Sequence, residues 1–221
     1  MTRRAIKPKT PSPDTARPRF VRVSNLLRQT DEGAALFHAL LDYVIRNECR
    51  FVRGKVWDPG SAKGVVNERI RRVVTLKDLG RFEAVFTERI RRHLPDVMPQ
   101  IGIRAGGNPK IDMHITASGD GDYFRRHRDT ERTGTRVVSF VYYFHRAPRR
   151  FSGGELRLGS RRAAGARLER ACRPVTLSPR LDSIVFFPSR TEHEVLRVSV
   201  PSRAFADGRF TITGWVHRRQ T

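Results

Sequence analysis

Apolar residues recur at helical spacing in two segments of the N-terminal half of the chain. From Thr30, a candidate N-cap, to about Asn47, one stripe holds Leu36, Phe37, Leu40, Leu41, Val44 and Ile45. From about Leu79 to Leu94, a second stripe holds Phe82, Val85, Phe86, Ile90 and Leu94. Because proline lacks an amide hydrogen and clashes with the preceding turn, we expect Pro95 to end this helix. The pattern therefore predicts two amphipathic helices, preceded by a short strand at residues 20–23.

After about residue 100 the pattern changes to short β-rich runs separated by turn residues. The runs cover 111–117, 136–145, 154–158, 174–177, 183–187, 193–199 and 209–217. Their number and length are typical of an antiparallel sandwich or barrel. The sequence shows no internal repeat and no second core. We therefore predict one mostly β domain, with the helices covering the outer face of its major sheet.

Side-chain alternation divides two of these runs into unlike faces. In 209–217, one face is small and polar after its first residue: Arg209, Thr211, Thr213 and Trp215. The other face is apolar and consists of Phe210, Ile212 and Val216. In 136–145, Val137, Ser139, Val141 and Tyr143 share a face. We interpret the first face of each run as a cavity wall, with Arg209 and Tyr143 as its polar anchors.

The net charge of +22, from 44 basic and 22 acidic residues, raises the question of a polyanionic partner. Such a field attracts nucleic acids and acidic substrates. Only six of the basic residues are lysines, and the arginines are scattered along the whole chain, as coding composition also produces. No recognised nucleic-acid motif accompanies the charge. Nucleic acid is therefore a partner that the charge allows but the motifs do not favour.

Residues 1–18 are basic and rich in proline, and we expect them to form a disordered tail. They contain no apolar stretch of the kind that a secretion signal needs. No apolar run reaches membrane-spanning length, so the sequence predicts no membrane segment. Cys49 and Cys172 share no close-spaced motif, which favours a reducing compartment. Together these features predict a cytoplasmic location, and they leave the oligomeric state open.

Two histidines, an aspartate and an arginine carry the chemical signal of the chain. His127 and Asp129 stand one residue apart, His193 follows at a distance, and Arg209 opens the last β-rich run. Two imidazoles and one carboxylate can hold one face of a metal and leave the opposite positions free, as in non-haem Fe(II) oxygenases. An arginine after the distal histidine suggests a small dicarboxylate co-substrate, because a guanidinium binds a carboxylate in a two-pronged fashion.

These residues stand within a longer ordered set of motifs. The set comprises Asp112-Met-His-Ile-Thr, Gly-Asp-Tyr-Phe-Arg-Arg-His127-Arg-Asp129, Arg136-Val-Val-Ser-Phe-Val-Tyr-Tyr-Phe144, Gly153-Gly-Glu-Leu-Arg157, Asp182-Ser-Ile-Val-Phe-Phe187, His193-Glu-Val and Arg209-Phe-Thr-Ile-Thr-Gly-Trp215. In this ordered set of motifs, the chain resembles the prolyl 4-hydroxylase-like branch of the Fe(II)- and 2-oxoglutarate-dependent dioxygenases. The resemblance covers residues 100–217 well and the N-terminal helices more loosely.

The resemblance implies a double-stranded β-helix, or jelly roll, with the N-terminal helices packed on its major sheet. The domain would span 19–221, with a helical part at 19–100 and a β-helix core at 101–217. By resemblance, the iron ligands are His127, Asp129 and His193. The 2-oxoglutarate contacts would come from Arg209, Tyr143, Thr211 and Thr213. The chain departs from the pattern of this branch at two positions that concern substrate geometry. Phe124 stands where the branch often has a tyrosine, and a small residue near Ala117 stands where some relatives have a further active-site tyrosine.

The leading hypothesis is an enzyme that hydroxylates an unactivated C–H, of a prolyl residue or a proline-like amino acid, in a peptide, protein or small molecule. It would use Fe(II), O₂ and 2-oxoglutarate, with ascorbate as a stimulant, and release succinate. One alternative is oxidation of a small metabolite or natural-product intermediate. A nucleic-acid demethylase is disfavoured, because Thr213 and Trp215 stand where that group has a second arginine. Another alternative is a non-catalytic, basic binding protein for a nucleic acid or an acidic partner.

Overall fold

The computed structural model describes residues 17–58, 60–104, 107–130, 134–159 and 173–218. Most of the segment predicted as a disordered tail, residues 1–16, lies outside these ranges. The described part contains two α-helices, α1 (Asp31–Arg46) and α2 (Phe82–Gln100). It also contains two short 3₁₀ helices, at Glu48–Arg50 and Phe205–Asp207. No helix among the described residues is both long and apolar enough to cross a membrane.

Helix α1 begins and ends as its sequence pattern predicts. The Thr30 side chain accepts a hydrogen bond from the Gly33 amide at 3.1 Å, which satisfies one free donor of the first turn. Asp31 and Glu32 place negative charge at the same end, where the helix dipole favours it. The buried stripe consists of Phe37, Leu40, Leu41 and Val44. The prediction of this helix and of its N-cap is confirmed.

Helix α2 runs through both of its prolines to Gln100, so the prediction that Pro95 ends it is wrong. Pro95 and Pro99 lie one turn apart on the exposed face. The buried stripe continues past Pro95 through Val97 and Met98, and it reaches Ile101 at the C-cap. A proline costs a helix about 3 kcal/mol. Burying three further apolar side chains, at about 1.5–3 kcal/mol each, offsets that loss and carries the helix past both prolines.

A seven-stranded sheet forms the larger layer, in the order β1-β13-β9-β16-β7-β6-β2. Its strands are β1 (Val21–Ser24), β2 (Val52–Arg53), β6 (Val74–Leu76), β7 (Ile111–Ser118), β9 (Arg136–Phe144), β13 (Ser183–Pro188) and β16 (Arg209–His217). The central strand β16 pairs antiparallel with both β7 and β9 along most of its length. Each of the three long runs predicted at 111–117, 136–145 and 209–217 is therefore a strand at the centre of this sheet.

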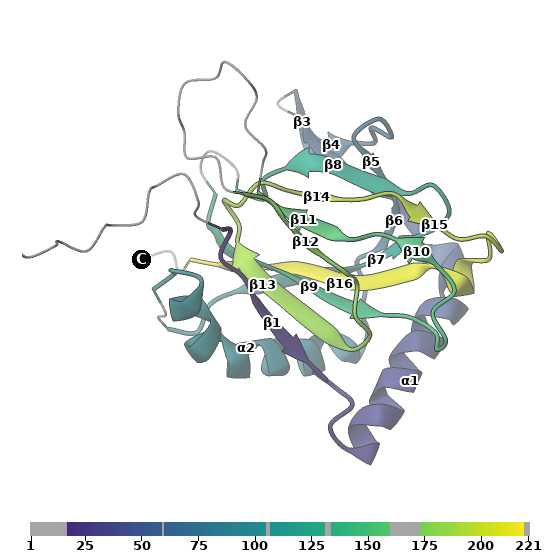
Figure 1. The fold of residues 1–221 in the computed structure, drawn as a ribbon, viewed down its shortest axis with the longest axis horizontal. Helices are drawn as coiled ribbons and strands as arrows, with labels where there is room; N and C mark the ends of the chain where they lie inside the picture. The colour runs from purple at the N-terminus through teal and green to yellow at the C-terminus, as the bar shows by residue number, and fades with distance from the viewer. Residues whose placement is uncertain (1–16, 59, 105–106, 131–133, 160–172, 219–221) are drawn as a thin grey trace, which may run out of the picture.

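A five-stranded sheet faces the larger one, in the order β12-β11-β14-β8-β5 (Figure 1). Its strands are β5 (Arg71–Arg72), β8 (Tyr123–His127), β11 (Leu156–Leu158), β12 (Val175–Leu177) and β14 (His193–Val195). Two small pairs complete the described strands: β3 (Val56–Asp58) with β4 (Ser61–Val65), and β10 (Ser152–Gly153) with β15 (Val198–Ser199). Strand β8 and the short strands between residues 52 and 76 had no clear alternation in the sequence.

The two larger apolar cores of the described residues hold these layers together. Helices α1 and α2 lie against the outer face of the larger sheet, and their apolar residues share one core with Phe140, Tyr142, Phe210 and Ile212. The second core lies between the two sheets and includes Val141, Val185, Phe187, Leu156 and Leu158. The described residues thus form a mostly β, jelly-roll-like structure with few helices. The space between its sheets is where the polar face of β16 points.

Candidate metal centre and co-substrate cavity

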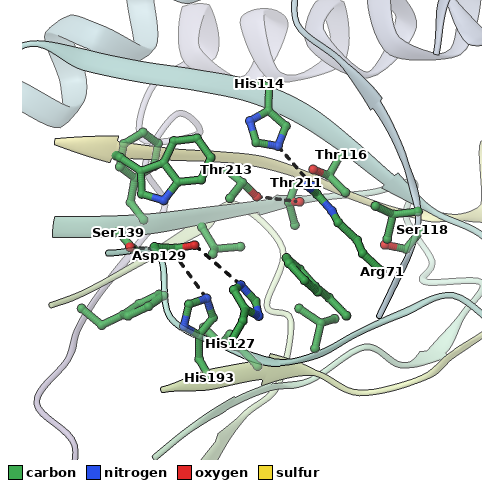
Figure 2. A pocket seen from close by; sticks show the side chains of 18 of the residues that line it. Arg71, His114, Thr116, Ser118, His127, Asp129, Ser139, His193, Thr211 and Thr213 are labelled. Carbon is green, nitrogen blue, oxygen red and sulfur yellow. Dashed lines mark hydrogen bonds and ion pairs between the residues drawn. The ribbon is translucent and has the colours of Figure 1, made fainter. Parts of the chain in front are cut away.

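Two neighbouring strands of the five-stranded sheet bring the three predicted metal ligands together. His127 ends β8, His193 begins β14, and the two lie opposite each other in the antiparallel pairing of these strands. Asp129 follows β8, and its amide donates to the Ser189 carbonyl at 3.1 Å. One ligand atom from each residue lies within 4.8 Å of the other two. Figure 2 shows the three side chains converging on one point.

Hydrogen bonds select the ring nitrogens that face the centre. Nδ1 of His127 lies 2.8 Å from the Arg125 carbonyl, and Nδ1 of His193 lies 2.9 Å from the Thr191 carbonyl. A carbonyl only accepts, so each Nδ1 carries the proton and each Nε2 keeps a free lone pair. The two Nε2 atoms lie 3.6 and 3.5 Å from the Asp129 oxygens. This is the tautomer that a metal needs.

Asp129 is held in its charged form by its neighbours. Burial would raise the pKa of its carboxyl, but His127, His193 and the Ser139 hydroxyl lower it well below its usual range. The Ser139 hydroxyl donates to Asp129 Oδ2 at 2.7 Å. For His193, burial lowers the pKa to about 4, so this imidazole is neutral at ordinary pH. One charged carboxylate and two imidazoles that turn Nε2 toward it form a donor set that suits Fe(II).

A cavity opens next to the three ligands, between the sheets. The polar face of β16 forms one wall of it, as the alternation of 209–217 predicts: Arg209, Thr211, Thr213 and Trp215 line the cavity. Strand β7 contributes His114, Thr116 and Ser118. His114, which no pattern in the sequence marked, therefore belongs to the cavity wall. Ala117, the position near which the branch's second tyrosine was sought, points instead into the helix-side core.

Arg209 lies at the opposite end of this cavity wall from Ser139, and it is 2% exposed. Its guanidinium carbon lies 5.1 Å from the ring centroid of Tyr143. Tyr143 is fully buried and does not itself line the cavity, whereas its neighbour Tyr142 faces the helices and donates to Asp182 Oδ1 at 2.8 Å. The strand register thus places Tyr143, not Tyr142, on the inner face beside Arg209.

Gly154 creates the space for the Arg209 side chain. It adopts a φ of +70°, a conformation that glycine accepts readily and other residues rarely adopt. A Cβ at this position would lie 2.5 Å from Arg209 Cδ and 3.0 Å from its Nε. The Gly-Gly pair before β11 therefore leaves room for the Arg209 side chain, which belongs to the larger sheet. The local sequence around the glycines did not reveal this contact.

Unpartnered polar atoms around Arg209 fit a bound carboxylate. Nε and Nη2 of Arg209 and the Tyr143 hydroxyl are buried without a hydrogen-bond partner among the described residues. The same holds for the hydroxyls of Thr116 and Ser118, which lie on the neighbouring strand. Leaving such donors unpaired costs about 1–3 kcal/mol each. A dicarboxylate with one end on Arg209 and the other at the metal would satisfy them.

Three cavity residues have contacts that the sequence reasoning did not predict. Arg71 lies on the short strand β5, where no periodic pattern marks it. Ser139 was placed on the correct face but without a role, and it supports Asp129. Phe124, noted only as a departure, stacks on the His127 ring with centroids 3.6 Å apart. Such roles depend on strands that meet across the two sheets, which a sequence window does not contain.

Comparisons with known proteins agree with this geometry. Residues 113–217 match the family model of the 2OG-Fe(II) oxygenase superfamily. An uncharacterized PKHD-type hydroxylase of Synechocystis sp. is 39% identical over 138 residues, which cover 62% of this chain. The aligned part is 46% of that protein, so the chain spans about half the length of this curated relative.

Solved structures share the fold. A Pseudomonas putida prolyl 4-hydroxylase superposes with a TM-score of 0.60 at 21% identity, covering 92% of this chain and 94% of the other. A Trichoplax adhaerens prolyl hydroxylase, solved with a hypoxia inducible factor peptide fragment, gives a TM-score of 0.59 at 20% identity, covering 90% and 83%. Residues 113–217 are thus similar to the 2OG-Fe(II) oxygenase superfamily, and the chain shares the fold of the solved prolyl 4-hydroxylases.

Proposed function

We propose that this protein is an Fe(II)- and 2-oxoglutarate-dependent dioxygenase that hydroxylates an unactivated C–H. One observation carries the proposal: a triad of two histidines and a carboxylate, with its ligand atoms within 4.8 Å, opens onto a cavity that also contains a buried arginine. The supporting arrangement of strands corresponds to the double-stranded β-helix that the resemblance implies. The favoured substrate is a prolyl residue or a proline-like amino acid, in keeping with the hydroxylases that share the fold and part of the sequence.

The residues divide the work between metal and co-substrate. His127, Asp129 and His193 would hold Fe(II) and leave its remaining positions free for 2-oxoglutarate and O₂. Arg209 would bind the distal carboxylate of 2-oxoglutarate, with Tyr143 as a further donor and Thr211 and Thr213 on the same wall. Bound Fe(II), with O₂, would couple conversion of 2-oxoglutarate to succinate and CO₂ with insertion of one oxygen atom into the substrate C–H.

Aromatic side chains pack against both histidines of the triad. Phe124 covers one face of the His127 ring, and Phe187 contacts His193 edge-on with centroids 4.8 Å apart. Both rings help to hold the imidazoles in place. We expect ascorbate to stimulate turnover by returning iron to the ferrous state after uncoupled cycles.

The deciding experiment is anaerobic titration of the apo-protein with Fe(II) and then 2-oxoglutarate. We expect a weak visible charge-transfer band from the chelated complex. His193→Ala should abolish it by removing a metal ligand, whereas Arg209→Ala should shift it to higher 2-oxoglutarate concentration. Aerobic incubation should then form succinate, at a rate that a substrate panel of prolyl peptides and free amino acids increases.

A folded protein with no band would refute the proposed co-substrate site. The alternative of a non-catalytic binding protein for a nucleic acid or acidic partner would then become the better explanation of the +22 charge. A band with turnover only of free small molecules would instead favour oxidation of a metabolite or natural-product intermediate. The cavity contains a feature that bears on this choice.

A further inference from the structure

A second arginine lies in the same cavity on the opposite sheet from Arg209. Arg71 belongs to β5, pairs with Phe124 of β8, and lines the cavity together with the metal ligands. Its guanidinium carbon lies 4.9 Å from the Phe124 ring centroid, and that ring stacks on His127. Figure 2 shows the side chain reaching across the cavity to His114. The Arg71 charge is thus one aromatic ring away from the metal centre.

The contacts of Arg71 leave its charge without an opposite partner. Nη1 donates to the Lys55 carbonyl at 3.0 Å, and Nη2 lies 3.4 Å from His114 Nε2. Nε packs near Gly54 and has no hydrogen-bond partner among the described residues. Both contacts are with neutral groups, and no described carboxylate forms an ion pair with Arg71. Its neighbour Arg72, by contrast, pairs with Asp122 at 3.3 Å.

Partial burial among the cavity side chains makes this unpaired charge costly. Desolvation lowers the pKa of Arg71 to about 10, and Asp129 is the anion that partly opposes the shift. Burial and the adjacent Arg71 lower the pKa of His114 to about 3, so this ring is neutral. A buried cation is normally retained only with a counter-ion. Arg71 remains strongly basic at neutral pH, so the structure leaves a place for an anion beside it.

The proposed co-substrate does not supply that anion. A divalent iron, the Asp129 carboxylate, a 2-oxoglutarate dianion and the Arg209 guanidinium together carry no net charge. Arg71 then remains as one positive charge in excess within the cavity. A ligand that balances it must arrive with the primary substrate, and a planar guanidinium matches a carboxylate in both charge and shape.

We propose that Arg71 is a specificity-determining residue that binds a free carboxylate of the primary substrate, with His114 supporting its guanidinium. This inference rests on the proposed function and narrows it. The substrate class becomes a free amino acid, or a residue bearing a chain-terminal carboxylate, whose oxidised carbon lies a few bonds from that group. An internal prolyl residue, which has no carboxylate of its own, does not neutralise Arg71.

Binding can be measured without turnover through Trp215, which lines the cavity. The chain contains two tryptophans, and Trp57 is 65% exposed. In a Trp57→Phe background, fluorescence therefore reports on Trp215 alone. The protein is loaded with Zn(II), which is redox-inert, and with 2-oxoglutarate. It is then titrated with matched acid and amide pairs: L-proline and L-prolinamide, L-pipecolate and its amide, and glycyl-L-proline and its amide.

We expect at least one acid to bind about 10- to 100-fold more tightly than its amide, the ratio that loss of a charged hydrogen bond produces. Arg71→Gln should abolish this ratio, and Arg71→Lys should restore part of it by returning the charge without the fork. Arg72→Gln, an exposed arginine on the same strand, is the matched control and should keep the wild-type ratio. With Fe(II) and O₂, Arg71→Gln should raise KM for the acid more than it lowers kcat.

Several results would overturn the assignment. Equal binding of acid and amide in every pair, binding of neither member of any pair, or an unchanged ratio in Arg71→Gln would each remove it. Weakened 2-oxoglutarate binding in Arg71→Gln, equal to that of Arg209→Gln, would assign Arg71 to the co-substrate instead. The acid-to-amide ratio of the wild-type protein is measured without any variant. It therefore still tests the proposal if Arg71→Gln misfolds. Failure of the metal and 2-oxoglutarate to bind at all would refute the proposed function itself.

Discussion

The hydroxyl of Ser139 is the side-chain hydrogen-bond donor to the metal carboxylate, and its removal tests the centre without touching a ligand. It donates to Asp129 Oδ2 at 2.7 Å, and Ser189 Oγ lies 3.0 Å from Ser139 Oγ. Since Ser139 has a single hydroxyl hydrogen and gives it to the carboxylate, Ser189 must donate to Ser139. The two serines thus form a short chain of hydrogen bonds that ends on Asp129.

Ser139→Ala should weaken binding of a divalent metal by about 10- to 100-fold, the effect typical of residues that orient metal ligands. A hydrogen bond to a charged group contributes about 1.5–3 kcal/mol, which corresponds to a similar factor. The lost donor also leaves Asp129, whose side chain is 11% exposed, less well satisfied in the apo-protein. We therefore expect a fall of about 1–2 kcal/mol in the free energy of unfolding.

The assay is competition for Zn(II) against a chromophoric chelator, with urea unfolding of the apo-protein in parallel. Ser189→Ala is the matched control, because it removes a buried serine hydroxyl that contacts Ser139 and not the carboxylate. Its metal affinity should change by less than about threefold. Wild-type metal affinity in a folded Ser139→Ala protein would refute the reasoning, as would an equal loss in both variants.

Three further predictions follow from the cavity. Arg209→Gln should weaken 2-oxoglutarate binding by about 30-fold or more while metal affinity stays unchanged. Isothermal titration calorimetry with the metal and with 2-oxoglutarate measures both affinities. Undiminished 2-oxoglutarate affinity would contradict the prediction. Gly154→Ala should lower the free energy of unfolding by about 1–3 kcal/mol and displace Arg209, because the alanine Cβ would lie 2.5 Å from Arg209 Cδ. A stable variant with normal 2-oxoglutarate affinity would show that Arg209 does not need the space beside Gly154. Acidification should destabilise the apo-protein between about pH 6.5 and 4, because burial lowers the pKa of His193 to about 4 and that of His114 to about 3. The unfolded chain takes up these protons first, so the free energy of unfolding falls as the pH falls, by up to about 1.4 kcal/mol per pH unit for each histidine. Urea unfolding in that pH window should show a weaker dependence of stability on pH for His114→Gln. An identical pH dependence in wild type and variant would be evidence that His114 does not cause it.

The sequence by itself determined those features that depend on local periodicity. Helix α1 with its Thr30 cap, the central strands, and the division of 209–217 into a cavity face and a core face could all be predicted. They could because a strand repeats every two residues and a helix every 3.6, so burial leaves a pattern in a short window. The predicted ligands His127, Asp129 and His193 do meet in the structure, and their role as metal ligands stays a prediction.

Tertiary structure decided the features that depend on partners far away in the chain. Helix α2 passes Pro95 because the sheet buries the stripe beyond it, which no local rule for proline contains. Arg71 enters the cavity because β5 pairs with β8, and Gly154 is required because Arg209, on the other sheet, fills the space above it. Cavity shape and unbalanced charge arise from contacts between distant segments, and these segments meet only when the two sheets close on each other.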